Sequence, residues 1–192
     1  MPNRRPNCAP SSEKLGISGS GPTIEETLAL AAQSAADGDV TSAMEAYSFV
    51  LEQDMENPKA LAGMARLYLK VQQPEQAKAM LDMAIDSKDP DILGLRAALE
   101  LADGAPTDIS GLRARLATNS RDFDAMYDLG RALAGQGETA EAIDQLLEIV
   151  KYEPEWNAKA AQTYLFKIFT AVGNTSDLAR AGRRRLSSML FS

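Results

Sequence analysis

The chain has 192 residues, a net charge of −7, 45% hydrophobic residues and only 6% aromatic residues, which is enough for one domain with a core or a short array of repeats. The acidic balance argues against nucleic-acid binding and against attachment to anionic membranes, and no apolar run is long enough to span a membrane. There is no histidine and a single cysteine, Cys8, which excludes a zinc site and a histidine-activated nucleophile. We therefore expect no catalytic residue, no metal, no cofactor and no small-molecule substrate.

Residues 1–21 are rich in Pro, Ser, Gly and Asn, and we predict that they form a disordered N-terminal tail or linker. Prolines and polar residues follow Arg4 and Arg5 where a secretory signal would have an apolar segment. A single cysteine also fits a reducing compartment, so we expect a cytoplasmic location.

From residue 22 to the end we predict one helical domain. Apolar residues recur at i, i+3, i+4 and i+7 in segments separated by turn signals such as Gly38-Asp39, Asn57-Pro58, Asp89-Pro90 and Gly173-Asn174. β-branched runs and strict alternation are absent from the sequence. The pattern predicts an all-α protein of about ten short helices joined by tight turns.

The helical segments repeat. A small residue is followed by a large one four residues later and a medium one seven residues later, which places the three on one helix face, and the small one lets a neighbouring helix approach. The three sets are Ala43, Tyr47 and Val50; Ala77, Leu81 and Ala84; and Ala142, Leu146 and Ile149. The first two sets are 34 residues apart.

This period and pattern resemble the tetratricopeptide repeat (TPR). The clearest unit is 122–154, with Leu129-Gly130, a turn at Gly137, Ala142 and a closing Pro154. The resemblance implies a right-handed superhelix of antiparallel helix pairs with a C-terminal capping helix. Its units would be about 23–57, 58–89, a degenerate pair at 90–121 in which Leu112 replaces the expected alanine, 122–154, and a terminal pair at 155–191.

The ending Trp156–Phe191 points to one particular family of TPR proteins, because generic repeats do not end in this way. Residues 13 to 192 look like the C-terminal half of the YbbN-type (CnoX) thioredoxin–TPR proteins, the chaperedoxins. In that family a thioredoxin domain precedes the repeats, whereas this sequence has no Cys-x-x-Cys motif, so we expect that domain to be absent.

Three functions follow from these observations. The resemblance implies the non-catalytic protein-binding part of a co-chaperone, which holds unfolded client proteins and delivers them to the chaperonin in protein folding and redox-stress protection. The alternative is a generic TPR scaffold for another protein assembly. A thiol–disulfide oxidoreductase using Cys8 is disfavoured, because nothing in the sequence around this cysteine would lower its pKa and there is no second cysteine to resolve a disulfide.

Candidate binding residues lie in two places. In TPR proteins the first helix of each pair lines the concave face, which here predicts Arg66, Lys70, Asp128 and Arg131 as contact residues. These side chains are also what an ordinary solvated helix face would present.

The second place is the segment from Ser176 to the end, which has four arginines and one aspartate and so carries +3, against −10 for the rest of the chain. An apolar stripe on this predicted helix would seal the last pair. Arg180, Arg183 and Arg184, with Phe191 near them, would dock an acidic partner, which the resemblance identifies as the chaperonin.

Overall fold

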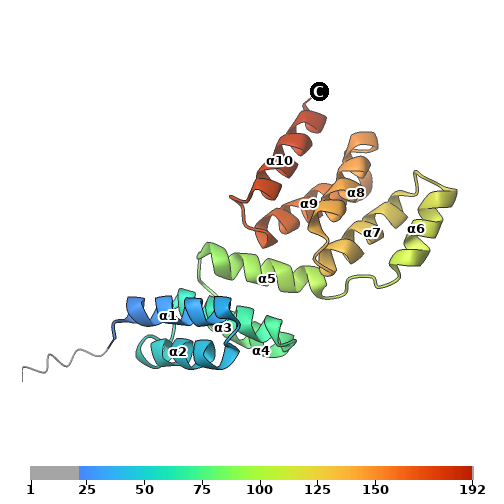
Figure 1. The fold of residues 1–192 in the computed structure, drawn as a ribbon. Helices are drawn as coiled ribbons and strands as arrows, with labels where there is room; N and C mark the ends of the chain where they lie inside the picture. Colours follow the sequence, from blue (N-terminus) through green and yellow to red (C-terminus); the bar gives the residue numbers. More distant parts are fainter. Residues whose placement is uncertain (1–21, 192) are drawn as a thin grey trace, which may run out of the picture.

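The computed structural model describes residues 22–191, and within them it contains ten α-helices and no strands (Figure 1). This confirms the predicted all-α class. The predicted tail at 1–21 lies outside the described residues, and the division into repeat units stays a prediction. The helices, in chain order, are α1 (Ile24–Asp37), α2 (Val40–Gln53), α3 (Pro58–Lys70), α4 (Pro74–Asp82), α5 (Pro90–Ala102), α6 (Ile109–Thr118), α7 (Phe123–Gly135), α8 (Thr139–Tyr152), α9 (Trp156–Ala171) and α10 (Asp177–Leu190).

Short polar side chains determine where most of these helices begin. Thr23 and Glu26 form a reciprocal capping box at the start of α1. Asp, Asn or Ser side chains accept a backbone N–H at the start of six others, namely Asp39, Asn57, Asp89, Asp108, Asp122 and Ser176. Proline occupies the first position of α3, α4 and α5, where its missing N–H costs nothing. Gly38 and Gly137 supply the positive φ that the turns after α1 and α7 require.

The first five helices form the N-lobe, Ile24 to Ala102, in which α1 pairs with α2 and α3 pairs with α4. Small residues lie where these helices meet: Ala31, Ala43 and Ala77 are completely buried. Met80 of α4 packs against the α1–α3 core, while Leu51 of α2 packs against the core between α3, α4 and α5. Helix α4 therefore packs on α3 and contributes to both of these cores.

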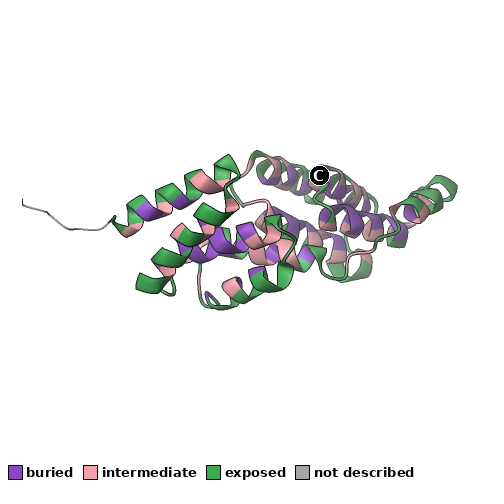
Figure 2. Ribbon diagram, turned by 60° about the horizontal axis from the view of Figure 1, so that its bottom comes forward, coloured by how far each residue is buried: buried purple, intermediate pink, exposed green. Residues whose placement is uncertain are grey.

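The last five helices form the C-lobe, Ile109 to Leu190, which has a single continuous core. Helices α7 and α8 form its central pair, α9 packs on α8, and α10 crosses both α8 and α9. Gly130 of α7 faces the side chain of Leu146, and Gly182 of α10 faces the ring of Phe169. In Figure 2 the buried residues form stripes along the facing sides of the helices, which is how stacked helix pairs hide their apolar surface.

Helix α5 belongs to both lobes. Its Ile92 lies in the N-lobe core and its Leu101 lies in the C-lobe core. Helix α5 packs extensively on α9 and also on α7, and Gly94 faces the backbone carbonyls of Thr170 and Ala171. Figure 1 shows α5 as the bridge between the two groups of helices.

Helices α5 and α6 hardly touch each other, unlike the other consecutive pairs. Residues 103–108 lead the chain away from α5, and α6 packs on α7 instead. Leu112 gives a physical reason, because the other second helices have Ala43, Ala77 or Ala142 at this position and a leucine prevents the close approach that alanine permits. Leu112 is buried in the C-lobe core.

Candidate protein-binding surfaces

The four residues predicted on the first helices form two separate pairs. Arg66 and Lys70 lie on α3, where Arg66 forms an ion pair with Asp91 at 2.9 Å and Lys70 Nζ lies 3.5 Å from the carbonyl oxygen of Ala35. Asp128 and Arg131 lie on α7 in the C-lobe and form an ion pair, with Arg131 Nη1 3.6 Å from Asp128 Oδ1. The structure thus does not bring the four together into one site.

Arg131 instead belongs to a group of aromatic residues that sequence reasoning missed. Tyr127 of α7 lies between Trp156 and Tyr164 of α9, with ring centroids 5.2 Å and 5.8 Å away, in a tilted and an edge-on arrangement. The guanidinium of Arg131 lies 6.0 Å from the centroid of Tyr127. We call Tyr127, Arg131, Trp156 and Tyr164 the aromatic cluster. All four residues are half-buried.

The position of the aromatic cluster is fixed from several sides. Arg131 donates a hydrogen bond of 2.8 Å to the carbonyl oxygen of Gly104, just after α5. Burial raises the pKa of the Tyr164 hydroxyl, and the neighbouring Arg131 opposes that rise. The cluster therefore joins α7, α9 and the end of α5 and keeps one side open to solvent. The spacing of Tyr127 and Arg131, four residues apart on one helix face, was the available signal in the sequence.

Trp156 reaches the cluster through an irregular start of α9. Asn157, Ala158 and Lys159 have φ between 44° and 67°, so the chain makes a left-handed turn before the regular helix begins. Gln162 Nε2 donates a 2.7 Å hydrogen bond to the Pro154 carbonyl and closes this turn. Such conformations cost about 1–2 kcal/mol per non-glycine residue, so the packing of Trp156 has to compensate for them.

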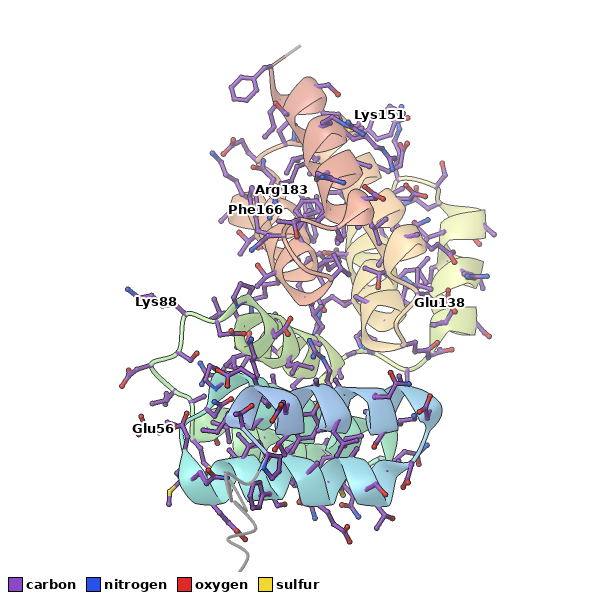
Figure 3. The ribbon with its side chains drawn as sticks, turned by 60° about the vertical axis from the view of Figure 1, so that its left-hand side comes forward. Glu56, Lys88, Glu138, Lys151, Phe166 and Arg183 are labelled. Atoms are coloured by element: carbon purple, nitrogen blue, oxygen red, sulfur yellow. The ribbon has the colours of Figure 1, made fainter. Side chains whose placement is uncertain are left out.

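The arginines of α10 divide into two kinds. Arg183 is half-buried: its guanidinium lies 5.4 Å from the ring centroid of Phe169 and donates a 2.9 Å hydrogen bond to the Asn174 carbonyl. Arg185 forms an ion pair with Asp144 of α8 at 2.5 Å. Both side chains hold α10 on the C-lobe. Figure 3 shows Arg183 and Phe166 on the side where α9 and α10 meet.

Arg180 and Arg184 are exposed instead. Within residues 22–191, Arg180 forms an ion pair only with Asp177 of its own helix, and Arg184 forms none. Phe191, directly after the helix, is 87% exposed. Of the four residues predicted to dock a partner, Arg180, Arg184 and Phe191 are therefore presented to solvent, and Arg183 is partly used by the fold.

The part of the chain that the structure describes holds no group of three or more His, Cys, Asp or Glu side chains that could bind a metal ion. Over the same residues, no helix combines the length and the apolar composition that a membrane crossing requires. Cys8, the residue of the oxidoreductase alternative, lies outside the described residues.

Comparisons with known proteins agree with this architecture. Two family profiles, both described as tetratricopeptide repeat, match residues 34–99 and residues 102–191. The break between them falls at the C-terminal end of α5. The chain is a tetratricopeptide-repeat protein.

Solved structures resemble the chain only at the level of the fold. A crystal structure of MamA protein is 20% identical, with a TM-score of 0.43, and the match covers 89% of this chain and 92% of the MamA chain. A second MamA structure is 21% identical, with a TM-score of 0.39, and the match covers 84% of this chain and 92% of the MamA chain. A domain of protein VP0806 from Vibrio parahaemolyticus, of unknown function, is 22% identical, covers 87% and 99%, and has a TM-score of 0.42. No curated protein matches the chain. Similarity at this level says nothing about function.

Proposed function

We propose that the chain is a non-catalytic protein-binding module whose main contact surface is the aromatic cluster. Half-buried Tyr and Trp side chains beside an arginine have the composition of protein-interface anchors, because they offer a large contact area with little conformational freedom to lose. Asp128 and Arg131 are proposed to add polar contacts there, and Arg66 and Lys70 to extend the surface over the N-lobe.

The more specific proposal is the co-chaperone role that the resemblance to YbbN-type proteins implies, in the cytoplasm. The aromatic cluster would hold unfolded client proteins, and Arg180, Arg184 and Phe191 would dock the chaperonin. These three residues are exposed together at the end of the repeat array, which supports the proposal. A scaffold for another assembly is the second candidate, because tetratricopeptide repeats alone support it equally well.

Suppression of aggregation separates these two functions. We expect the wild-type chain to slow the aggregation of a heat-denatured model enzyme, and Tyr127→Ala to reduce this protection several-fold, because it removes the ring on which Trp156 and Tyr164 pack. Tyr152→Ala is the matched control, since Tyr152 is an exposed tyrosine on α8. No protection by the wild-type chain would reject the co-chaperone role and leave the scaffold.

Chaperonin docking is tested by co-purification with the chain carrying Arg180→Glu and Arg184→Glu. Both side chains are exposed, so binding should be lost while the helical circular dichroism and the melting temperature stay nearly unchanged. Lys59→Glu with Lys88→Glu makes the same charge change at two exposed positions of the N-lobe. Equal retention by both double variants would contradict docking through α10. Arg183 is left intact because its reversal would also disturb the contact with Phe169.

A further inference from the structure

A groove runs between α4 and α5 on the N-lobe, and the functions proposed above do not use it. Its volume is about 420 Å³. Leu81, Leu99 and Ala102 contribute apolar surface, while Glu75, Asp82 and other charged residues line it from both helices.

The repeat geometry explains why this groove is open. One unit earlier, α4 packs on α3, and Met80 of α4 packs against the core formed by α1, α2 and α3. One unit later, α6 is the equivalent of α4, so the repeat would place α6 against α5 and next to α4. Because α6 packs on α7 instead, the groove lacks the helix that the repeat provides elsewhere.

The groove is acidic. Four carboxylates line it, Glu75, Asp82, Glu100 and Asp103, against two cations, Lys78 and Arg96. The guanidinium of Arg96 is already hydrogen-bonded at the end of α4, where it donates to the carbonyls of Leu81, Ala84 and Ile85. Glu100 is paired with Lys167 of α9 at 3.1 Å. This leaves Glu75, Asp82 and Asp103 with only Lys78 beside them in the groove.

The same chain carries a complementary surface on α10. At about 100° per residue, Arg180, Arg184 and Phe191 fall within a sector of roughly 40°. All three are exposed, and Phe191 is the most exposed large apolar side chain of the described residues. This face therefore combines two cations with one aromatic ring.

We propose that the α4–α5 groove binds the C-terminal end of α10 from a second copy of the chain. Phe191 packs against Leu99 and Ala102, the two apolar lining residues that keep accessible surface. Arg180 and Arg184 pair with Glu75, Asp82 and Asp103. Charge complementarity supports this occupant, since the exposed arginines of α10 meet an acidic groove.

The contact joins different surfaces of the two copies. Figures 1 and 3 show the C-terminal end of α10 far from α4, at the opposite end of the molecule. A copy that inserts its α10 into a neighbour still has its own groove open, so association is head-to-tail and produces rings or extended chains.

Sedimentation of the full chain tests the proposal in the absence of any client or chaperonin, so its outcome is separate from the proposed function. The average mass of the wild-type chain should rise with protein concentration and fall as NaCl is raised from about 0.05 M to about 0.5 M, because salt screens the pairs. Arg180→Glu with Arg184→Glu, and separately Glu75→Lys with Asp82→Lys, should each weaken association about tenfold or more. The control, Glu45→Lys with Glu52→Lys, reverses two exposed carboxylates of α2 and should leave association unchanged.

Mixing the two defective variants gives the sharpest result. In the mixture a reversed α10 meets a reversed groove, and a native α10 meets a native groove, so association should return although neither variant associates alone. A labelled synthetic peptide of residues 176–192 should bind the wild-type chain and bind the Glu75→Lys/Asp82→Lys variant at least tenfold more weakly. Failure of the mixture to associate, or equal binding of the peptide to both chains, would overturn the proposal.

Discussion

The two lobes are built from the same kind of helix pair but differ in how they are packed. The N-lobe has two separate cores, and many of their buried residues are alanines. The C-lobe has one continuous core with many large aliphatic side chains and the completely buried Phe169. Buried apolar area provides most of the stabilisation of such arrays, so the comparison teaches that the C-lobe is the stable part. In the N-lobe, Arg96 adds hydrogen bonds that hold the end of α4.

The largest expected effect comes from the centre of the C-lobe. Phe169→Ala should lower the free energy of unfolding by about 3–5 kcal/mol, because Phe169 of α9 is completely buried and its ring lies against Gly182 of α10. The matched control is Phe166→Ala on the same helix. Phe166 is 50% exposed and pairs edge-on with Phe169, so its loss should cost about 1 kcal/mol or less. Urea unfolding followed by circular dichroism measures both, and equal losses would contradict the single C-lobe core.

Arg96 provides the corresponding test in the N-lobe. Arg96→Met keeps much of the side-chain volume but removes three hydrogen bonds to the carbonyls at the end of α4. We expect a loss of about 2 kcal/mol, confined to the N-lobe and visible as faster amide hydrogen exchange in α4. Arg113→Met removes a single exposed ion pair with Glu141 and should cost less than about 1 kcal/mol. Unchanged exchange in α4 would show that Arg96 does not hold this helix end.

A smaller effect of opposite sign is expected at the start of α9. Ala158→Gly should raise stability by about 0.5–1 kcal/mol, because glycine adopts the positive φ of this position without strain. Ala160→Gly, just after the left-handed turn, should lower stability by a similar amount. Destabilisation by both substitutions would mean that residue 158 is in a right-handed helix.

Acid is expected to affect the N-lobe more than the C-lobe, by a modest amount. The pKa of Glu26 is lowered by hydrogen bonds from the backbone and side chain of Thr23, and that of Asp39 by hydrogen bonds from Ser42. In the C-lobe, the pKa of Asp122 is lowered, first by the hydrogen bond from the Ala125 amide and then by Arg115.

Because the pKa of each group is lower in the folded state than in the unfolded state, its contribution is complete above the ordinary carboxyl pKa of about 4 and is lost as the pH falls below it. Urea midpoints from pH 6 to pH 3 measure the loss. Asp122→Asn keeps a capping oxygen but cannot titrate, so it should be less stable than the wild-type chain at pH 6, and the difference should shrink as the pH falls to 3. A constant difference across this range would exclude the ionisation of Asp122 as the cause.

The helical repeats could be predicted from the sequence because their signals are local. Ala43, Ala77 and Ala142 repeat at positions where only a small residue allows two helices to meet, and all three are completely buried. The contact of α5 with α9 has no such signal, since these helices are far apart in the chain and meet at Gly94, which is an ordinary helix residue in the sequence.

The candidate binding residues were predictable only by type. Charge identified the arginines of α10, but which of them face solvent depends on Phe169, Asn174 and Asp144, contributed by three other segments. The aromatic cluster was missed because the contact of Trp156 with Tyr127 depends on a left-handed turn at residues 157–159. These residues are not glycines, so the sequence contains no signal for the turn.

The sharing of α5 has a mechanical consequence. Thirteen residues of helix span about 20 Å, and this rigid rod is held at one end among α3 and α4 and along its length by α9 and α7. A ligand that displaces α9 would tilt the rod and shift its other end against α3. Any such displacement would reach the N-lobe through α5, because this helix makes the contacts between the two lobes among the described residues.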